Sequence, residues 1–171
     1  DSVPGQADNN AIEFTIISSS GGANDFGDMT STKAYLNGMS NDVRGFMVGG
    51  ATTPEYVNQN TIEFVTMAST GNGNDFGDLS TTTRRGSSAA SNTRGILQIG
   101  QTTPLPGNRL IEFITLSTLG NSQNFGEVTT LAKSGSAAVA SSTRACFMGG
   151  VGTTGNAGHV SNVIDFVTIS P

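Results

Sequence analysis

The chain has 171 residues, a net charge of −5 and 12% charged residues, whereas 35% of the residues are hydrophobic and 23 are glycine. This hydrophobic content excludes a disordered chain, and the 8 scattered Lys and Arg residues exclude the clustered cations of a nucleic-acid or membrane surface. Many glycines with few charges are typical of short strands joined by tight turns. The single cysteine, Cys146, excludes an internal disulfide, and we expect it to be buried and unreactive.

A strand motif recurs at intervals of about 50 residues, which identifies an internal repeat. Its copies are Ile12-Glu13-Phe14, Ile62-Glu63-Phe64, Ile111-Glu112-Phe113 and Ile164-Asp165-Phe166. A Phe-Gly motif follows the first three copies, at 24–28, 74–78 and 123–127. We therefore expect one domain, residues 1–171, with repeat units at about 12–61, 62–110 and 111–163 and a terminal strand at 164–171.

In chain order, we expect each sheet to contain four short strands. The first is rich in small residues, as at 86–90, and the second runs from an arginine to a glycine pair, as at 44–50. A variable loop leads to the third strand, which carries Ile-Glu-Phe, and a Gly/Asn turn leads to the fourth, as at 74–78. Because no segment has the period of 3.6 residues of a helix, the sequence predicts an all-β fold of four-stranded antiparallel repeats.

The third strand indicates how these sheets pack. In residues 62–67, Ile62 and Phe64 point to one face and Val65 and Met67 to the other. Apolar side chains on both faces predict a strand that is covered on both sides. Sheets stacked between similar sheets, as the blades of a β-propeller are, would produce this pattern. A β-trefoil or a β-prism, which use threefold repetition at this length, are the alternatives.

The order of these motifs resembles the kelch repeat, which builds one class of β-propeller. Gly49-Gly50 and Gly149-Gly150 match the glycine pair of that repeat, whereas Ile99-Gly100 departs from it. Three phenylalanines occupy the place of the kelch tryptophan: Phe26, Phe76 and Phe125. Residues 62–79 are also similar to repeats in large tail-fibre or appendage proteins of phages, notably those that infect cyanobacteria. The resemblance implies kelch-like β-propeller blades in a virion surface protein rather than a catalyst.

The Phe-Gly motif also brings carboxylates together, at Asp25 with Asp28 and at Asp75 with Asp78. Such pairs are a feature of calcium sites, but a full site needs about six to eight oxygens. Because Asn, Asp and Gly also favour turns, we expect turns here, with calcium as the alternative. Residues 150–155 match G-x-G-x-x-G, yet a turn-rich loop follows instead of a helix, so we expect no cofactor.

The recurring charged residues are expected to serve the repeat itself. Each arginine of the second strand would donate to a turn carbonyl or pair with an Asp, and a ring of arginines that binds an anion is the alternative. These arginines are Arg44, Arg94 and Arg144. The acid of the third strand is expected to pair across strands. Since the acids recur with the repeat and His159 is the single histidine, the sequence predicts no metal site, no catalytic residues and no enzyme.

The loops at 51–60, 101–109 and 151–162 differ most between units. Loops free of packing constraints commonly make partner contacts, so we expect them on one face, with Tyr56, Arg109 and His159 as the contact residues. The sequence thus predicts a structural or adhesion component of a phage virion or surface appendage. Its expected location is extracellular or on the virion surface, in contact with copies of itself, neighbouring virion proteins or a host-surface glycan. A carbohydrate-binding, lectin-like module and a subunit of a bacterial extracellular filament are the alternatives.

The strands near the two ends predict assembly. The N-terminal part supplies the third and fourth strands of a sheet, and the C-terminal part supplies the first, second and third. Joining them would leave one surplus third strand. Because open strand edges tend to pair with other chains, we expect the terminal strands to complete a sheet with neighbouring copies or with a longer polypeptide.

Overall fold

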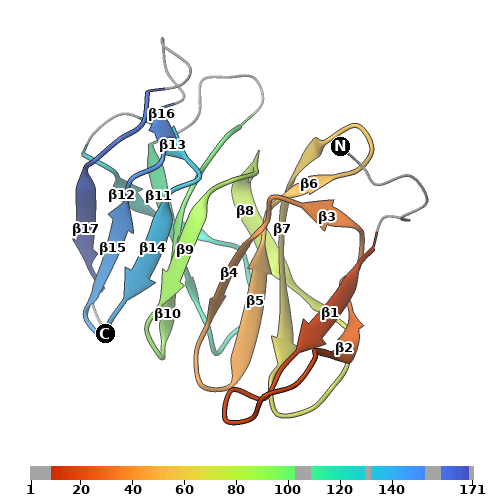
Figure 1. Ribbon diagram of the computed structural model, residues 1–171. Coiled ribbons are helices and arrows are strands. Elements are labelled where there is room, and N and C mark those ends of the chain that lie inside the picture. The colour runs from red at the N-terminus through yellow and green to blue at the C-terminus, as the bar shows by residue number, and fades with distance from the viewer. Residues whose placement is uncertain (1–8, 103–108, 130–131, 153–158, 170–171) are drawn as a thin grey trace.

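The computed structural model describes residues 9–102, 109–129, 132–152 and 159–169, which fold into a series of antiparallel sheets (Figure 1). No helix is present in this part of the chain, and correspondingly none of it forms a membrane-spanning helix. The all-β prediction is therefore confirmed.

The first two sheets contain the N-terminal half of the strands. The first sheet is the hairpin of β1 (Ala11–Phe14) and β2 (Asn24–Asp28). The second sheet contains, as successive neighbours, β4 (Asn37–Ser40), β5 (Arg44–Val48), β7 (Val57–Thr66) and β8 (Asn74–Thr83). The short strands β3 (Lys33–Ala34) and β6 (Ala51–Thr52) extend it at the upper end of β7 (Figure 1).

The third sheet has the predicted composition. It consists of β9 (Ser87–Ala90), β10 (Arg94–Gln98), β11 (Leu110–Thr115) and β12 (Gln123–Glu127). In the described residues the last sheet has three strands, β14 (Ala137–Ala140), β15 (Arg144–Met148) and β17 (Ile164–Thr168). The short strands β13 (Lys133–Ser134) and β16 (Val151–Gly152) pair beside it. Four-stranded pairing is thus present in the second and third sheets, whereas the first and last sheets have fewer described strands.

Successive sheets stand side by side, so that the first strands β4, β9 and β14 are neighbours (Figure 1). One hydrophobic cluster joins the second and third sheets through Phe46, Ile62 and Phe76 on one side and Leu97 and Ile114 on the other. A second cluster joins the third and last sheets. Ile62 and Val65 are both buried although they point to opposite faces of β7, which confirms that this strand is covered on both sides.

The phenylalanines predicted to be equivalent occupy equivalent strands, but only one is fully buried. Phe76 lies in the first hydrophobic cluster, with its ring edge-on to Phe46 at 5.3 Å between ring centroids. Phe26 and Phe125 are half-buried. The difference follows from the sheets around them, because the second sheet has a complete neighbouring sheet on the face that carries Phe76.

The fourth strands of the first and second sheets, β2 and β8, closely approach the turn of the following sheet at a glycine. Gly27 and Gly77 have φ angles of 149° and 147°, and a Cβ at either position would overlap the carbonyl of Gly71 or Gly120, respectively. The amide of Gly71 donates to the carbonyl of Phe26 (2.7 Å), and that of Gly120 to Phe76 (2.9 Å). We call this contact, together with the side chains around it, the joint between two sheets.

Substitution of Gly77 by alanine should open the second joint. Gly77 and Gly126, at φ 147° and 151°, both have backbones that disfavour a side chain, but no atom of the described residues lies within 4 Å of the place of a Cβ at Gly126. Gly126→Ala therefore adds backbone strain alone, whereas Gly77→Ala adds a clash with Gly120. In urea unfolding of the dilute protein, we expect Gly77→Ala to lower the free energy of unfolding by about 2 kcal/mol more than Gly126→Ala does. Equal losses would contradict the close contact.

Candidate functional site

Three of the four recurring acids of the third strands, Glu63, Glu112 and Asp165, lie buried in the joints, whereas Glu13 on β1 is exposed. Glu63, on β7, is 1% exposed, and its Oε2 accepts a hydrogen bond from the backbone N–H of Thr30 (2.9 Å), which follows the fourth strand of the first sheet. Its Oε1 accepts a hydrogen bond from Nζ of Lys33, whose side chain is also buried. Glu63 thus holds the second sheet to the segment that leaves the first.

The same arrangement recurs in the later joints. Asp165, on β17, accepts hydrogen bonds at Oδ1 from the backbone and the hydroxyl of Thr129 and at Oδ2 from Nζ of Lys133 (2.9 Å). In the middle joint, Glu112 accepts hydrogen bonds from Ser80, through its backbone and hydroxyl, and from the hydroxyl of Ser122. The expectation of direct cross-strand pairing is wrong for these three acids, because Thr30, Ser80 and Thr129 donate to them from the fourth strand of the preceding sheet or from the segment after it, rather than from a paired strand.

The hydrogen bonds to these acids change their titration. Burial alone raises the pKa of Glu63, but the hydrogen bonds from Lys33 and Thr30 outweigh it, so the net pKa lies below its ordinary value of 4.5. Burial likewise raises the pKa of Asp165, and the hydrogen bonds from Lys133 and Thr129 bring it below 3.8. Both carboxyl groups are therefore ionised in the folded protein at neutral pH.

Sequence reasoning missed the two buried lysines. Lys133 is 1% exposed, and both lysines pair with a third-strand acid. The sequence did carry a signal, because Lys33 and Lys133 each precede a small-residue strand at the same place in the unit. An isolated buried charge is costly, so a lysine that recurs there requires a buried acid nearby.

The three recurring arginines each lie over a phenylalanine of the neighbouring third strand. The guanidinium carbons of Arg44, Arg94 and Arg144 are 4.6, 4.6 and 4.7 Å from the ring centroids of Phe64, Phe113 and Phe166. Nη1 of Arg44 also donates to the carbonyl of Leu116 (2.8 Å), in the turn after β11 of the next sheet. The prediction that an arginine donates to a turn carbonyl is confirmed for Arg44.

The acids considered for calcium lie on strands rather than in turns. Asp25 and Asp28 are on β2, and Asp75 and Asp78 are on β8. The amides of Asp28 and Asp78 donate to Oδ1 of Asn72 and Asn121, both at 3.0 Å, as part of the first two joints. Within the described residues, no group of three or more His, Cys, Asp or Glu side chains is placed to hold a metal ion.

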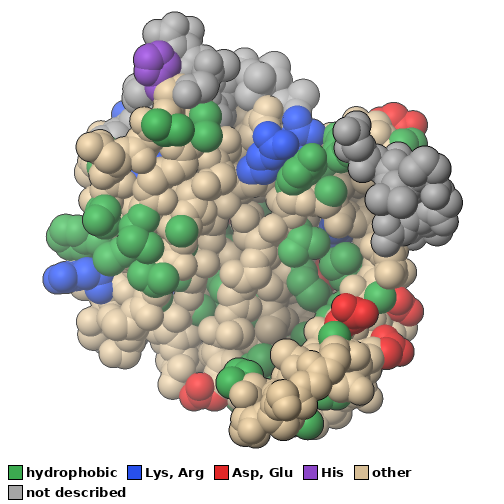
Figure 2. Space-filling view, viewed as in Figure 1, with side chains coloured by type: hydrophobic (Ala, Val, Ile, Leu, Met, Phe, Trp, Pro, Cys, Tyr) green, Lys and Arg blue, Asp and Glu red, His purple; other side chains and the backbone are tan. Residues whose placement is uncertain are grey.

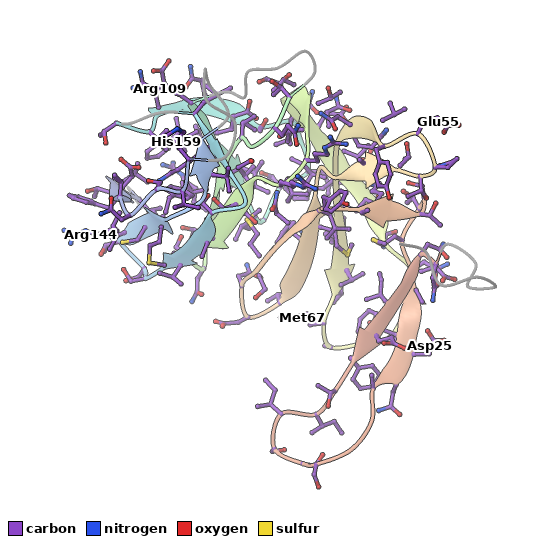
Figure 3. The ribbon with its side chains drawn as sticks, turned by 45° about the horizontal axis from the view of Figure 1, so that its top comes forward. Asp25, Glu55, Met67, Arg109, Arg144 and His159 are labelled. Atoms are coloured by element: carbon purple, nitrogen blue, oxygen red, sulfur yellow. The ribbon has the colours of Figure 1, made fainter. Side chains whose placement is uncertain are left out.

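The predicted contact residues lie at one end of the molecule. Figure 3 shows Arg109, His159 and Glu55, which precedes Tyr56, at the upper end of the view, and Asp25 near the opposite end. Nη2 of Arg109 donates to the carbonyl of Val128 (2.7 Å), and the carbonyl of His159 accepts a hydrogen bond from the amide of Gly152 (2.8 Å). The remaining parts of their loops, 103–108 and 153–158, lie outside the described residues.

Tyr56 belongs to a cluster that sequence reasoning only partly found. Both tyrosines of the chain lie together here, with 5.7 Å between the ring centroids of Tyr35 and Tyr56, and they are 43% and 46% exposed. The guanidinium carbon of Arg85 lies 4.3 Å from the ring centroid of Tyr35. Tyr35, Tyr56 and Arg85 all have positive φ angles, of 58°, 55° and 55°.

This cluster, the tyrosine cluster, is fixed by backbone contacts. The amide of Arg85 donates to the carbonyl of Tyr35 (2.9 Å), and Nη1 of Arg84 donates to the carbonyl of Tyr56 (3.3 Å). Non-glycine residues with positive φ are costly and concentrate at functional sites. The tyrosine cluster therefore combines exposed aromatic faces, two arginines and a held backbone conformation.

No protein-family model and no curated protein matches this sequence. The functional argument therefore rests on the joints and on the tyrosine cluster.

Acid should weaken the joints. Because the folded-state pKa values of Glu63 and Asp165 lie below their ordinary values of 4.5 and 3.8, their ionisation stabilises the fold above about pH 5 and loses this effect as the pH falls through the lowered values. We expect the melting temperature to be nearly constant from about pH 5 to 7 and to fall below about pH 4.5. In the double variant Glu63→Gln and Asp165→Asn, the melting temperature at neutral pH should be lower and its fall in acid shallower. A fall of the wild-type steepness in this variant would contradict the assignment.

Proposed function

We propose that this protein is a non-enzymatic adhesion component of a phage virion or a surface appendage, in which kelch-like β-propeller blades display a contact end. Two structural features support the proposal. The recurring acids Glu63, Glu112 and Asp165 are engaged in joints between sheets, and the two exposed tyrosines, Tyr35 and Tyr56, lie together beside the paired strands β3 and β6.

The arrangement of the sheets supports propeller blades. In a propeller, sheets stack face to face around a central axis and the first strands of successive blades line that axis. Here β4, β9 and β14 are neighbours, and hydroxyl groups join them: Oγ of Ser88 donates to the carbonyl of Gly38 (3.0 Å), and Oγ of Ser87 is 2.8 Å from Oγ of Ser136. These contacts favour blades over the β-trefoil and the β-prism.

The tyrosine cluster is the observation that carries the adhesion role. Exposed aromatic rings bind the apolar faces of ligands while their hydroxyl groups stay hydrated. Arginine donates pairs of hydrogen bonds to carboxylates, so Arg85, whose guanidinium lies over the Tyr35 ring, suits an acidic group. Figure 2 shows Lys or Arg side chains beside hydrophobic ones in the upper part of the molecule. The ligand class that fits is a host-surface glycan with carboxylate groups.

Loss of the tyrosine rings should weaken glycan binding without unfolding the protein. Tyr35 and Tyr56 are half exposed, so alanine at either position removes little buried surface. On an array of acidic glycans, we expect the affinity of Tyr35→Ala and Tyr56→Ala to fall by about tenfold, because an aromatic contact contributes up to about 1.5 kcal/mol beyond its buried area and about 1.4 kcal/mol is a tenfold change in affinity.

The matched controls are Arg109→Ala and His159→Ala at the same end of the molecule. A larger effect from these controls than from the tyrosines would move the contact to the loops that carry Arg109 and His159. Binding that survives in all four variants would refute the adhesion role of this end.

A further inference from the structure

The first sheet leaves a groove against the second. A groove of about 470 Å³ is lined by Phe14 and Phe26 on one side and by Met47, Val65 and Met67 on the other. Between the second and third sheets the corresponding place is filled by the first two strands of the second sheet, through Met39 and Phe46. The groove is therefore shaped to receive two strands of a sheet of this kind.

The last sheet exposes the face that would fill such a groove. Val139, Ile164 and Phe166 are 55%, 65% and 58% exposed, and Figure 2 shows hydrophobic side chains gathered over the β15 and β17 side of the molecule. At the same places of the second sheet, Met39 and Ile62 are buried against the third sheet. Arg144 lies over Phe166 and is exposed, whereas Arg44 reaches the next sheet.

The fourth strand of the third sheet also offers an open joint. Among the described residues, no atom lies within 4 Å of the place of a Cβ at Gly126, whereas Gly27 and Gly77, with nearly the same φ, each contact a turn. The corresponding turn of the first sheet, at Gly21 and Gly22, is likewise open, since no atom of the described part of the chain lies within 4 Å of either Cβ position.

Strands β1 and β17 are equivalent: both have the sequence of a third strand, and each lies where a third strand lies in its sheet. Both carry the Ile-acid-Phe motif of a third strand. β1 pairs with β2 so that Ile12 faces Gly27, and the same register places Ile62 opposite Gly77 and Ile111 opposite Gly126. β17 lies at the edge of its sheet, on the side where a fourth strand pairs in the complete sheets. β17 of one copy therefore fits the place that β1 occupies beside β2 of another.

We propose that two copies of this chain assemble by strand exchange, in which β17 of one copy displaces β1 of the second and pairs with its β2. Ile164 then faces Gly27 of the second copy, and Val139 and Phe166 enter the groove over its Val65 and Met67. Arg144 donates to the carbonyl of Met67 of that copy, as Arg44 does to Leu116.

The same exchange closes the open joint. The turn at Gly21 and Gly22 of the second copy docks on Gly126 of the first. Gly22 occupies the position that Asn72 and Asn121 have in the other turns. This joint therefore lacks the hydrogen bond that the asparagine Oδ1 accepts in the other two joints. When both copies exchange, two chains form a ring of about six sheets, within the usual range of propellers.

The exchange is favourable because it replaces one strand pairing with an equivalent one and buries additional apolar side chains. The pairing of β1 with β2 is lost, but β17 restores it in the same register. The apolar side chains of the last sheet and of the groove leave water in addition. This inference goes beyond the proposed adhesion role, since it concerns the first and last sheets and not the tyrosine cluster.

The two competing strands give opposite outcomes for matched substitutions. Phe166→Asp places a charge in the new interface, so we expect the dimer to weaken by more than about a hundredfold. Phe14→Asp weakens β1 in its own chain and frees β2, so we expect the dimer to tighten by at least about tenfold. Both phenylalanines are partly exposed in the single chain, and circular dichroism checks that each variant is folded. The measurement is sedimentation of the full chain over a range of concentrations.

Gly126→Ala and Arg144→Ala provide independent tests. Each should weaken the dimer by at least about tenfold while the single chain stays folded. A chain that is monomeric at every concentration overturns the proposal. So does equal weakening by Phe14→Asp and Phe166→Asp, because β1 would then belong to the interface. Tyr56→Ala should leave the dimer unchanged, and the Phe166→Asp monomer should still bind glycan, which separates failure of this inference from failure of the adhesion role.

Discussion

The joint between successive sheets is the interaction on which the rest of this structure depends. A four-stranded sheet with apolar side chains on both faces cannot bury them alone, so each sheet needs a neighbour. Burial by itself would not fix the angle between sheets. The buried acid fixes this angle. The carboxylate of Glu63 can be buried without water only where the N–H of Thr30 and the ammonium group of Lys33 donate hydrogen bonds to it. The glycine contact then sets the distance, since Gly27 admits the carbonyl of Gly71 and no side chain.

The strands and their packing could be predicted because they follow from periodicity within one unit. Ile62 and Val65 on opposite faces already require cover on both sides. The partners of the acids could not be predicted, because the alternation of a strand says which face carries Glu63 but not which sheet supplies its donor. That donor, Thr30, lies 33 residues earlier in the chain, beyond the reach of cross-strand reasoning.

The tyrosine cluster was found only in part for a different reason. Tyr56 lies in a loop that varies between units, and variability is visible in the sequence. Tyr35 lies between β3 and β4, and it reaches Tyr56 because β3 pairs with β6. Its left-handed backbone has no sequence signature, since Gly or Asn would be the residues expected there. The left-handed conformation of Tyr35 is imposed by the surrounding structure, so it can be seen only in the folded protein.

The joints also have a direction. Each sheet presents its fourth strand forward and receives the preceding fourth strand through its own acid and turn, so the two sides of a joint differ. An interface of this kind either closes into a ring or continues as a filament, depending on the rotation between neighbours. Because the joints within one chain share their contacts, a joint between copies built from the same residues would repeat the same rotation. In the proposed assembly, the contacts of Gly126 and Phe166 decide whether copies join, and the rotation set by Glu63, Glu112 and Asp165 would decide how many sheets a closed ring holds.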